Sequence, residues 1–250
     1  MCSMVIEICR SELVTTVTIV LEIMDNNKKS VFVDPLIHSI DRHVEALITN
    51  VAEVGIDVFL DEGVLKEIPI ISSVISFYKI GHSIKELAYI KKLSIFIQEL
   101  NNGIADDEKR KEYISQIEAD RNRSQHEIEY LLLMIDRVIQ YEKSRQLAKL
   151  YLSYLNKDIN WISLCQYSEV LDRMLPWDYE YLDINVLSDC NRDSLSNCAL
   201  QRLEGLGIIV SNDVAGAFDI NGNTLATRKD GTYNLTAFGN TFYQIVIATS

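Results

Sequence analysis

Cysteine and long apolar runs are scarce in this sequence, and each scarcity excludes a class of protein. The five cysteines, at positions 2, 9, 165, 190 and 198, form no C-x-x-C pair, so they indicate neither a disulfide framework nor a zinc site. No stretch reaches the roughly 18 consecutive apolar residues that span a bilayer. The first residues lack a basic segment followed by a small-residue cleavage site, so we expect no secretory signal and a cytoplasmic location.

Basic residues are outnumbered by acidic ones. The chain of 250 residues has 36 acidic and 24 basic side chains, a net charge of −12, which opposes binding to a phosphate backbone or an anionic bilayer. The glycine-rich, G-x-S-x-G and H-E-x-x-H motifs of nucleotide sites, hydrolases and metalloproteases are missing. We therefore expect no cofactor and no metal. The hydrophobic fraction of 48% is enough for a folded core.

Helical periodicity dominates residues 35–176, which we assign to a helical domain. Asp34 followed by Pro35 predicts a helix start with Asp34 as N-cap, and the apolar spacing continues it as one long helix to Gly63. Pro69 opens a short helix, and further helices are predicted near 83–100, 107–117, 124–141, around 147–155 and from Trp161 to 175. Residues 1–34 are left unassigned.

A change of pattern after Pro176 predicts a small second domain, residues 177–250. Helix signals at 178–187 and 194–206 lead into a short strand at 207–210. Turn residues at 219–231 precede a strand at 232–235, and Thr236 caps a last helix. This order, with the run from Leu200 to Gly207, resembles a winged helix. The predicted fold is therefore mainly α, a helical bundle body with a small C-terminal winged-helix-like α+β module.

The charges of this module oppose the DNA binding that a winged helix suggests. Residues 178–250 contain nine acidic and four basic side chains, a balance of −5, and the helix that would read bases carries only Arg202. We expect the module to contact protein or to pack on the body, and we expect no binding to duplex DNA.

The segment from Arg121 to His126 reads R-N-x-x-x-H and resembles the motif of HEPN ribonucleases, helical proteins that act as dimers. The resemblance implies that His126 would handle the proton of the attacking 2′-hydroxyl or of the leaving oxygen. Arg121 would stabilise the charge that develops on the phosphate, and a second chain would complete the site for RNA. The alternative interpretation is a solvated, charged helix start.

Residues 64–81 are apolar nearly all round rather than along one stripe. Such a helix is buried in a bundle, or it inserts into a membrane or a partner's groove. We expect residues 70–80 to be buried, because exposure would forgo roughly 1.5 to 3 kcal/mol for each large side chain. Lysines at positions 79, 85, 91 and 92 keep open an approach of residues 68–92 to anionic lipid. The candidate partner or membrane contacts are Ile70, Ile71, Val74, Ile75, Phe77 and Tyr78.

Three further segments, residues 62–70, Leu132 to Arg137 and Val170 to Leu175, resemble a set of uncharacterised bacterial helical proteins. The whole plan is similar to that of the alpha-type abortive-infection proteins. The resemblance implies a bacterial accessory or defence protein in the cytoplasm or at the inner membrane. We expect a non-catalytic interaction or effector protein that works through a protein partner, self-association or membrane contact. The alternative is the metal-independent HEPN-like ribonuclease, with Arg121 and His126 across a dimer.

Overall fold

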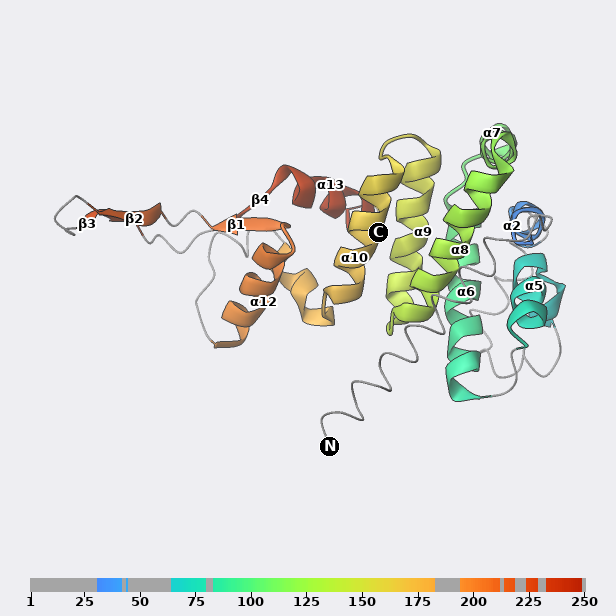
Figure 1. Ribbon diagram of the computed structural model, residues 1–250, viewed down its shortest axis with the longest axis horizontal. Coiled ribbons are helices and arrows are strands. Elements are labelled where there is room, and N and C mark those ends of the chain that lie inside the picture. The colour runs from blue at the N-terminus through green and yellow to red at the C-terminus, as the bar shows by residue number, and fades with distance from the viewer. Residues whose placement is uncertain are drawn as a thin grey trace.

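The computed structural model describes residues 31–41, 44, 64–79, 83–182, 194–211, 214–218, 224–228 and 233–248. These parts are mainly helical, as the sequence predicts. In Figure 1, α6, α8, α9 and α10 stand side by side, α2 and α5 lie on one side of them, and α12, α13 and the strands lie on the other.

The body contains seven α-helices within the described residues and two 3-10 helices. The elements are α2 (Val33–Ser39), η1 (Val64–Glu67), α5 (Pro69–Tyr78), α6 (Ile84–Asn102), α7 (Asp107–Ala119), α8 (Arg121–Arg137), α9 (Tyr141–Leu155), α10 (Trp161–Arg173) and η2 (Pro176–Leu182). One apolar core runs from α2 and α5 through α6 and α9 to α10 and α13. The central residues Leu93, Ile97, Leu150 and Leu164 are at most 1% exposed.

Short polar residues begin several helices, as expected from the sequence. The Ser83 hydroxyl accepts a hydrogen bond from the Glu86 N–H, and the Glu86 carboxylate accepts one from the Ser83 N–H at 3.0 Å, so α6 starts with a capping box. Asp106 and Asn160 are the N-caps of α7 and α10, and the side chain of each accepts a hydrogen bond from a backbone N–H of the first turn. Thr236 caps α13 by accepting from the Gly239 N–H at 2.9 Å, which confirms its predicted role.

The first helix is shorter than predicted. α2 has Phe32 rather than Asp34 as N-cap, and it ends at Ser39 because the backbone of Ile40 leaves the helical region (φ −89°, ψ 65°). Two tertiary contacts stop it there: Asn101 donates to the Ser39 carbonyl at 2.9 Å, and the Ser39 hydroxyl accepts from the Ile70 N–H at 3.0 Å. Except for position 44, the rest of the predicted long helix, from 42 to Gly63, lies outside the described residues.

Two buried lysines satisfy the C-terminal ends of α8 and α10. Lys92 of α6 and Lys143 of α9 each donate to two backbone carbonyls, which otherwise lack intrahelical partners and carry partial negative charge. The acceptors are the carbonyl oxygens of Asp136 (2.5 Å), Val138 (2.9 Å), Asp172 (3.0 Å) and Met174 (2.7 Å). Burial lowers the pKa of both lysines. The ends of α8 and α10 are therefore stabilised in the same way, each by one lysine from a neighbouring helix.

The described C-terminal elements are two helices and two small antiparallel sheets. They are α12 (Ser194–Gly205), β1 (Ile209–Ser211), β2 (Val214–Phe218), β3 (Thr224–Arg228), β4 (Tyr233–Leu235) and α13 (Ala237–Val246). β1 pairs with β4, with Val210 opposite Asn234, and β2 pairs with β3. The two predicted strands are present, and the β2–β3 pair is an addition, because its small residues between turn signals gave little alternation to recognise. The winged-helix arrangement itself stays a prediction.

Candidate functional site

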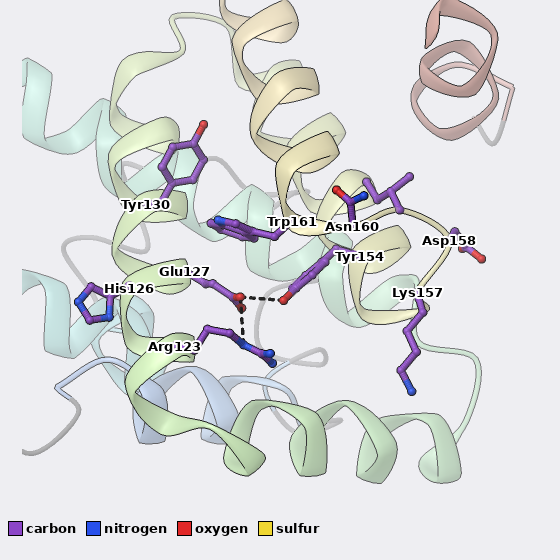
Figure 2. Close-up of a pocket in the computed structure, with 10 residues that line it drawn as sticks. Arg123, His126, Glu127, Tyr130, Tyr154, Lys157, Asp158, Asn160 and Trp161 are labelled. Carbon is purple, nitrogen blue, oxygen red and sulfur yellow. Dashed lines mark hydrogen bonds and ion pairs between the residues drawn. The ribbon is translucent and has the colours of Figure 1, made fainter. Parts of the chain in front are cut away.

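A groove of about 870 Å³ lies where the first half of α8 faces the connection between α9 and α10 (Figure 2). It combines charged, polar and aromatic side chains from segments that are close in space but separate in sequence. Its lining residues are Arg123, His126, Glu127 and Tyr130 of α8, Tyr154 of α9, Lys157, Asp158, Ile159 and Asn160 of the connection, and Trp161 of α10.

Glu127 is the buried polar centre of this groove. Its side chain is only 8% exposed, accepts a hydrogen bond from the Tyr154 hydroxyl at 2.7 Å, and lies 3.3 Å from Nε of Arg123. Burial raises the pKa of Glu127, whereas Tyr154 and Arg123 lower it. Burial and the bond to Glu127 raise the pKa of Tyr154 to about 12, so its hydroxyl keeps its proton and donates. The three side chains form a mutually satisfied unit.

Trp161 forms the aromatic wall of the groove. Tyr130 and Tyr154 pack edge-to-face against it, each with a ring-centre distance of 5.5 Å and interplanar angles of 72° and 61°. Such pairs add stability beyond their buried area and hold the rings in fixed orientations. Asn160 fixes the start of α10 beside Trp161, because its side chain accepts from the Ser163 N–H at 2.9 Å. The indole is therefore held in place at the groove surface.

Two cationic side chains approach the groove from opposite sides. Arg123 is 56% exposed and turns Nε toward Glu127, while its terminal nitrogen atoms point toward the side on which Lys157 lies (Figure 2). Lys157 sits just after α9 with a left-handed backbone (φ 67°), which turns the chain toward α10. The groove lining thus contains a guanidinium group, an ammonium group and the Trp161 indole.

The structure does not bring Arg121 and His126 together within one chain. Arg121 pairs with Asp34 of α2 at 2.6 Å and does not line the groove. His126 lies on the groove rim, with Nδ1 at 2.7 Å from the Asn122 carbonyl, and its ring points away from Glu127 (Figure 2). Five positions along a helix correspond to about 140° around its axis, so the two side chains leave α8 in different directions. Their pairing across a dimer stays a prediction.

The predicted contact residues of α5 divide between the core and the surface. Phe77 and Tyr78 are 40% and 43% exposed, so the expectation that residues 70–80 are buried is wrong for the end of this helix. α5 packs one side against α2 and α6, and Ile75 is half-buried. The buried side chains are Ile70, Ile71 and Val74. Ile80 lies outside the described residues.

Further apolar side chains are exposed where α5 and α8 end and α6 and α9 begin. Ile84 is 89% exposed and Ile139 is 87% exposed, the two highest values among the exposed large apolar residues described. A smaller pocket of about 320 Å³ lies at this end, lined by residues such as Tyr78, Lys85, Leu133 and Asp136. We name this surface the apolar end and define it by Phe77, Tyr78, Ile84, Leu133, Ile139 and Tyr141.

Arg202, the one basic residue of α12, faces the helical body. Its Nε and terminal nitrogen donate to both carboxylate oxygens of Asp178 at 2.8 and 2.7 Å, and Asp178 is completely buried. Asp178 also accepts from the Leu175 N–H at 2.7 Å. The side chain that a DNA-binding interpretation needs is therefore committed to joining α12 to η2.

Similarity to known proteins does not assign a function to this site. Comparisons with protein-family models, curated proteins and solved structures found no match to the chain. Among the described residues, no group of three histidine, cysteine or acidic side chains is placed to hold a metal ion. No helix in that part of the chain is long and apolar enough to cross a membrane.

The centre of the groove was not predicted from the sequence. Tyr154 lies in the predicted helix around 147–155 and Trp161 begins the next predicted helix. Neither residue was assigned to a site. The available signal was Glu127, a carboxylate that shares a helix face with the buried residues Ser124, Ile128 and Leu131. A charged residue at such a position needs a buried partner, and here that partner is Tyr154.

Proposed function

We propose that this protein is a non-catalytic interaction protein whose groove binds a short acidic segment of a partner protein. The observation that carries the proposal is a groove lined by Trp161 and by the cations Arg123 and Lys157, in which Glu127 holds Tyr154 and Nε of Arg123. A ligand carboxylate would accept hydrogen bonds from Arg123 and Lys157, since a guanidinium fork suits carboxylate geometry. A neighbouring flat side chain of the ligand would pack on Trp161.

The charge balance of the groove favours a peptide over a nucleic acid. Its two cations share the lining with the carboxylates of Glu127 and Asp158. A nucleic acid strand brings one negative charge with every nucleotide, and its affinity rises with the number of phosphates that the protein neutralises. The negative charges of a peptide with one or two carboxylates match the two cations of the groove. The phosphates of an RNA strand would outnumber them.

A second candidate function, the metal-independent ribonuclease, has one observation in its favour. His126 is exposed on the rim of a groove that also holds Arg123 and Lys157. In that case, Arg121 would have to exchange its ion pair with Asp34 for a place beside the His126 of a second chain. The RNA arm of the experiment below separates this candidate from the first.

We also propose that the C-terminal module is winged-helix-like and serves protein contact. The order α12, β1, the β2–β3 pair, β4 and α13 supports this, with β2–β3 in the place of a wing. The ion pair between Arg202 and Asp178 and the module's net negative charge oppose duplex DNA as its target. A wider role in bacterial phage defence rests on the sequence resemblance alone.

The groove proposal is tested by the fluorescence of Trp161. The chain has two tryptophans, so Trp177→Phe leaves Trp161 as the single reporter. We expect peptides with a glutamate beside a phenylalanine to change this fluorescence saturably, and matched peptides with lysine for glutamate to have no effect. Arg123→Ala should abolish the response. Equal responses to both peptide sets would contradict the proposal.

The same protein is incubated with single-stranded RNA and the products are separated by size. We expect the RNA to stay intact and to leave Trp161 fluorescence unchanged. Cleavage by the wild type that disappears in His126→Ala and in Arg121→Ala would establish the ribonuclease instead. A Glu118→Ala variant, at an exposed residue of α7 outside this motif, is the control for nonspecific damage near the start of α8.

A further inference from the structure

The apolar end presents two isoleucines that are both exposed and firmly positioned. Ile84 is the first residue of α6 and lies between Ser83 and Glu86, the two residues of its capping box. Ile139 follows Val138, whose side chain is buried and whose carbonyl is bound by Lys92. Hydrogen-bonded backbone next to each residue fixes where its side chain projects. Fixed apolar side chains in water are typical of a contact surface, because little freedom is lost when they are covered.

A complementary hollow lies on the same surface. The pocket of about 320 Å³ has Tyr78, Leu132 and Leu133 as apolar lining, with Lys85 and Asp136 among its polar residues. Tyr89 also lines the pocket, and its hydroxyl donates a hydrogen bond to the Leu132 carbonyl, which fixes the ring. A protruding aliphatic side chain fits a pocket of this character. Protrusions and a pocket are therefore present together at one end of the molecule.

The charges around the apolar end have both signs. Lys79 and Lys85 are exposed, and Lys91 lies over the Tyr141 ring at 4.5 Å. Asp136 and Glu142 are also exposed there. An anionic lipid surface selects basic clusters, so these carboxylates oppose a membrane. A two-fold contact sets each patch against its own copy, and only a patch that carries both signs can then pair positive groups with negative ones.

We infer that the apolar end is the interface of a two-fold symmetric homodimer of this chain. Ile84 and Ile139 of one copy pack against the apolar end of the other, and the mixed charges form its rim. This surface is distinct from the groove, so the inference goes beyond the proposed ligand binding and does not depend on it.

This dimer would be incompatible with the shared ribonuclease site. His126 and Arg137 are eleven positions apart on α8, a distance of about 16 Å along the helix, and Arg137 is the residue nearer the apolar end. Dimerisation through the apolar end keeps the His126 of one copy far from the Arg121 of the other. The two arrangements therefore predict different effects of the same substitutions.

Sedimentation analysis of the full chain over a range of concentrations tests the interface. We expect the wild type to dimerise, and Ile84→Asp and Ile139→Asp each to raise the dimer dissociation constant at least tenfold. Aspartate suits the first turn of α6 and both sites are exposed, so folding should be retained, as thermal unfolding would show. Ile162→Asp on α10 is the matched control, because Ile162 is 70% exposed away from this end, and it should dimerise like the wild type.

Several results would overturn the inference. These are a wild type that is monomeric at every concentration, aspartate variants that dimerise as well as the wild type, or a dimer that only Arg121→Ala weakens. A monomer that co-sediments with phosphatidylserine vesicles, and loses this binding in Ile84→Asp, would assign the surface to lipid instead. Trp161 titration of the Ile84→Asp variant with the acidic peptide should remain unchanged, so failure of the dimer and failure of the groove are separate results.

Discussion

Two arginine–carboxylate pairs in this molecule have the same chemistry and different surroundings. Asp178 and Arg202 meet through two hydrogen bonds of 2.7 and 2.8 Å, and the carboxylate is fully buried. Glu127 meets Arg123 through one contact of 3.3 Å, and Arg123 remains 56% exposed. The first pair uses Nε and one terminal nitrogen of its arginine, whose side chain is 27% exposed. The second leaves donors directed at a groove.

The comparison separates a structural role from a binding role. A buried carboxylate whose two oxygens both accept from one arginine has no acceptor left for a ligand, and removing one partner strands the other charge. An arginine that is more than half exposed contributes little to stability through its ion pair but remains available for an anion. The following substitutions test whether Asp178 has a structural role and Arg123 a binding role.

Asp178→Ala should be the most destabilising change. It removes both hydrogen bonds from Arg202 and leaves the Leu175 N–H without its acceptor, and breaking a buried pair in this way costs about 3 to 5 kcal/mol. Denaturant unfolding measures the loss. Glu180→Ala, at an exposed position two residues later, should change stability by less than about 0.5 kcal/mol. Equal effects of the two substitutions would refute the structural role of Asp178.

Lys143→Met should have the next largest effect. Methionine keeps the length of the side chain but leaves two carbonyls without their donor. The Met174 carbonyl is buried, and an unsatisfied buried group costs about 1 to 3 kcal/mol, whereas the bond to the Asp172 carbonyl is only part-buried and its loss costs less. Lys111→Met, on the exposed face of α7, is the control and should be nearly neutral. If both variants unfold at the same denaturant concentration as the wild type, the hydrogen bonds from Lys143 to the end of α10 contribute nothing to stability.

Glu127→Gln should change how stability depends on pH. The pKa of Glu127 is raised by folding from its ordinary value near 4.5, so the folded state binds the proton more tightly than the unfolded state. The carboxyl's contribution to stability is therefore complete below that value and is lost as the pH rises through the folded pKa. Unfolding free energies should show the wild type losing stability relative to Glu127→Gln as the pH rises, and a constant difference would be inconsistent with burial as the cause.

Lys157→Ala should have the smallest effect on folding and a clear effect on binding. The residue is exposed, so its removal should alter stability by less than about 0.5 kcal/mol. Binding of the acidic peptide, followed by Trp161 fluorescence, should weaken about tenfold because one of the two cations is lost. Lys149→Ala, at a residue of α9 outside the groove lining, is the matched control and should bind like the wild type.

The positions of most helices were predictable because their signals are local. The capping residues Ser83 and Thr236 and the apolar period of α6, α8 and α10 are visible in short windows of sequence. The end of α2 was not predictable, since it depends on Asn101, some sixty positions away in the chain. An amphipathic pattern that continues past Ser39 carries no information about that contact.

The candidate site was harder to predict than the fold. Spacing singled out Arg121 and His126, but the turn of the helix directs them apart and gives Arg121 a partner in α2. The groove instead depends on Glu127 meeting Tyr154 from the next helix, and on a connection that places Lys157 and Trp161 opposite α8. Such a site is defined by the packing of three segments, and no single stretch of sequence contains it.

Selection from a random peptide library displayed on phage tests whether the groove binds acidic segments, because the protein itself selects its ligand. Peptides would be selected on the wild type and depleted on Trp161→Ala combined with Arg123→Ala, so that only groove binders remain. The account predicts enrichment of sequences with an aspartate or glutamate beside an aromatic or large apolar residue. Enrichment of basic sequences, or an absence of peptides that distinguish the two proteins, would contradict it.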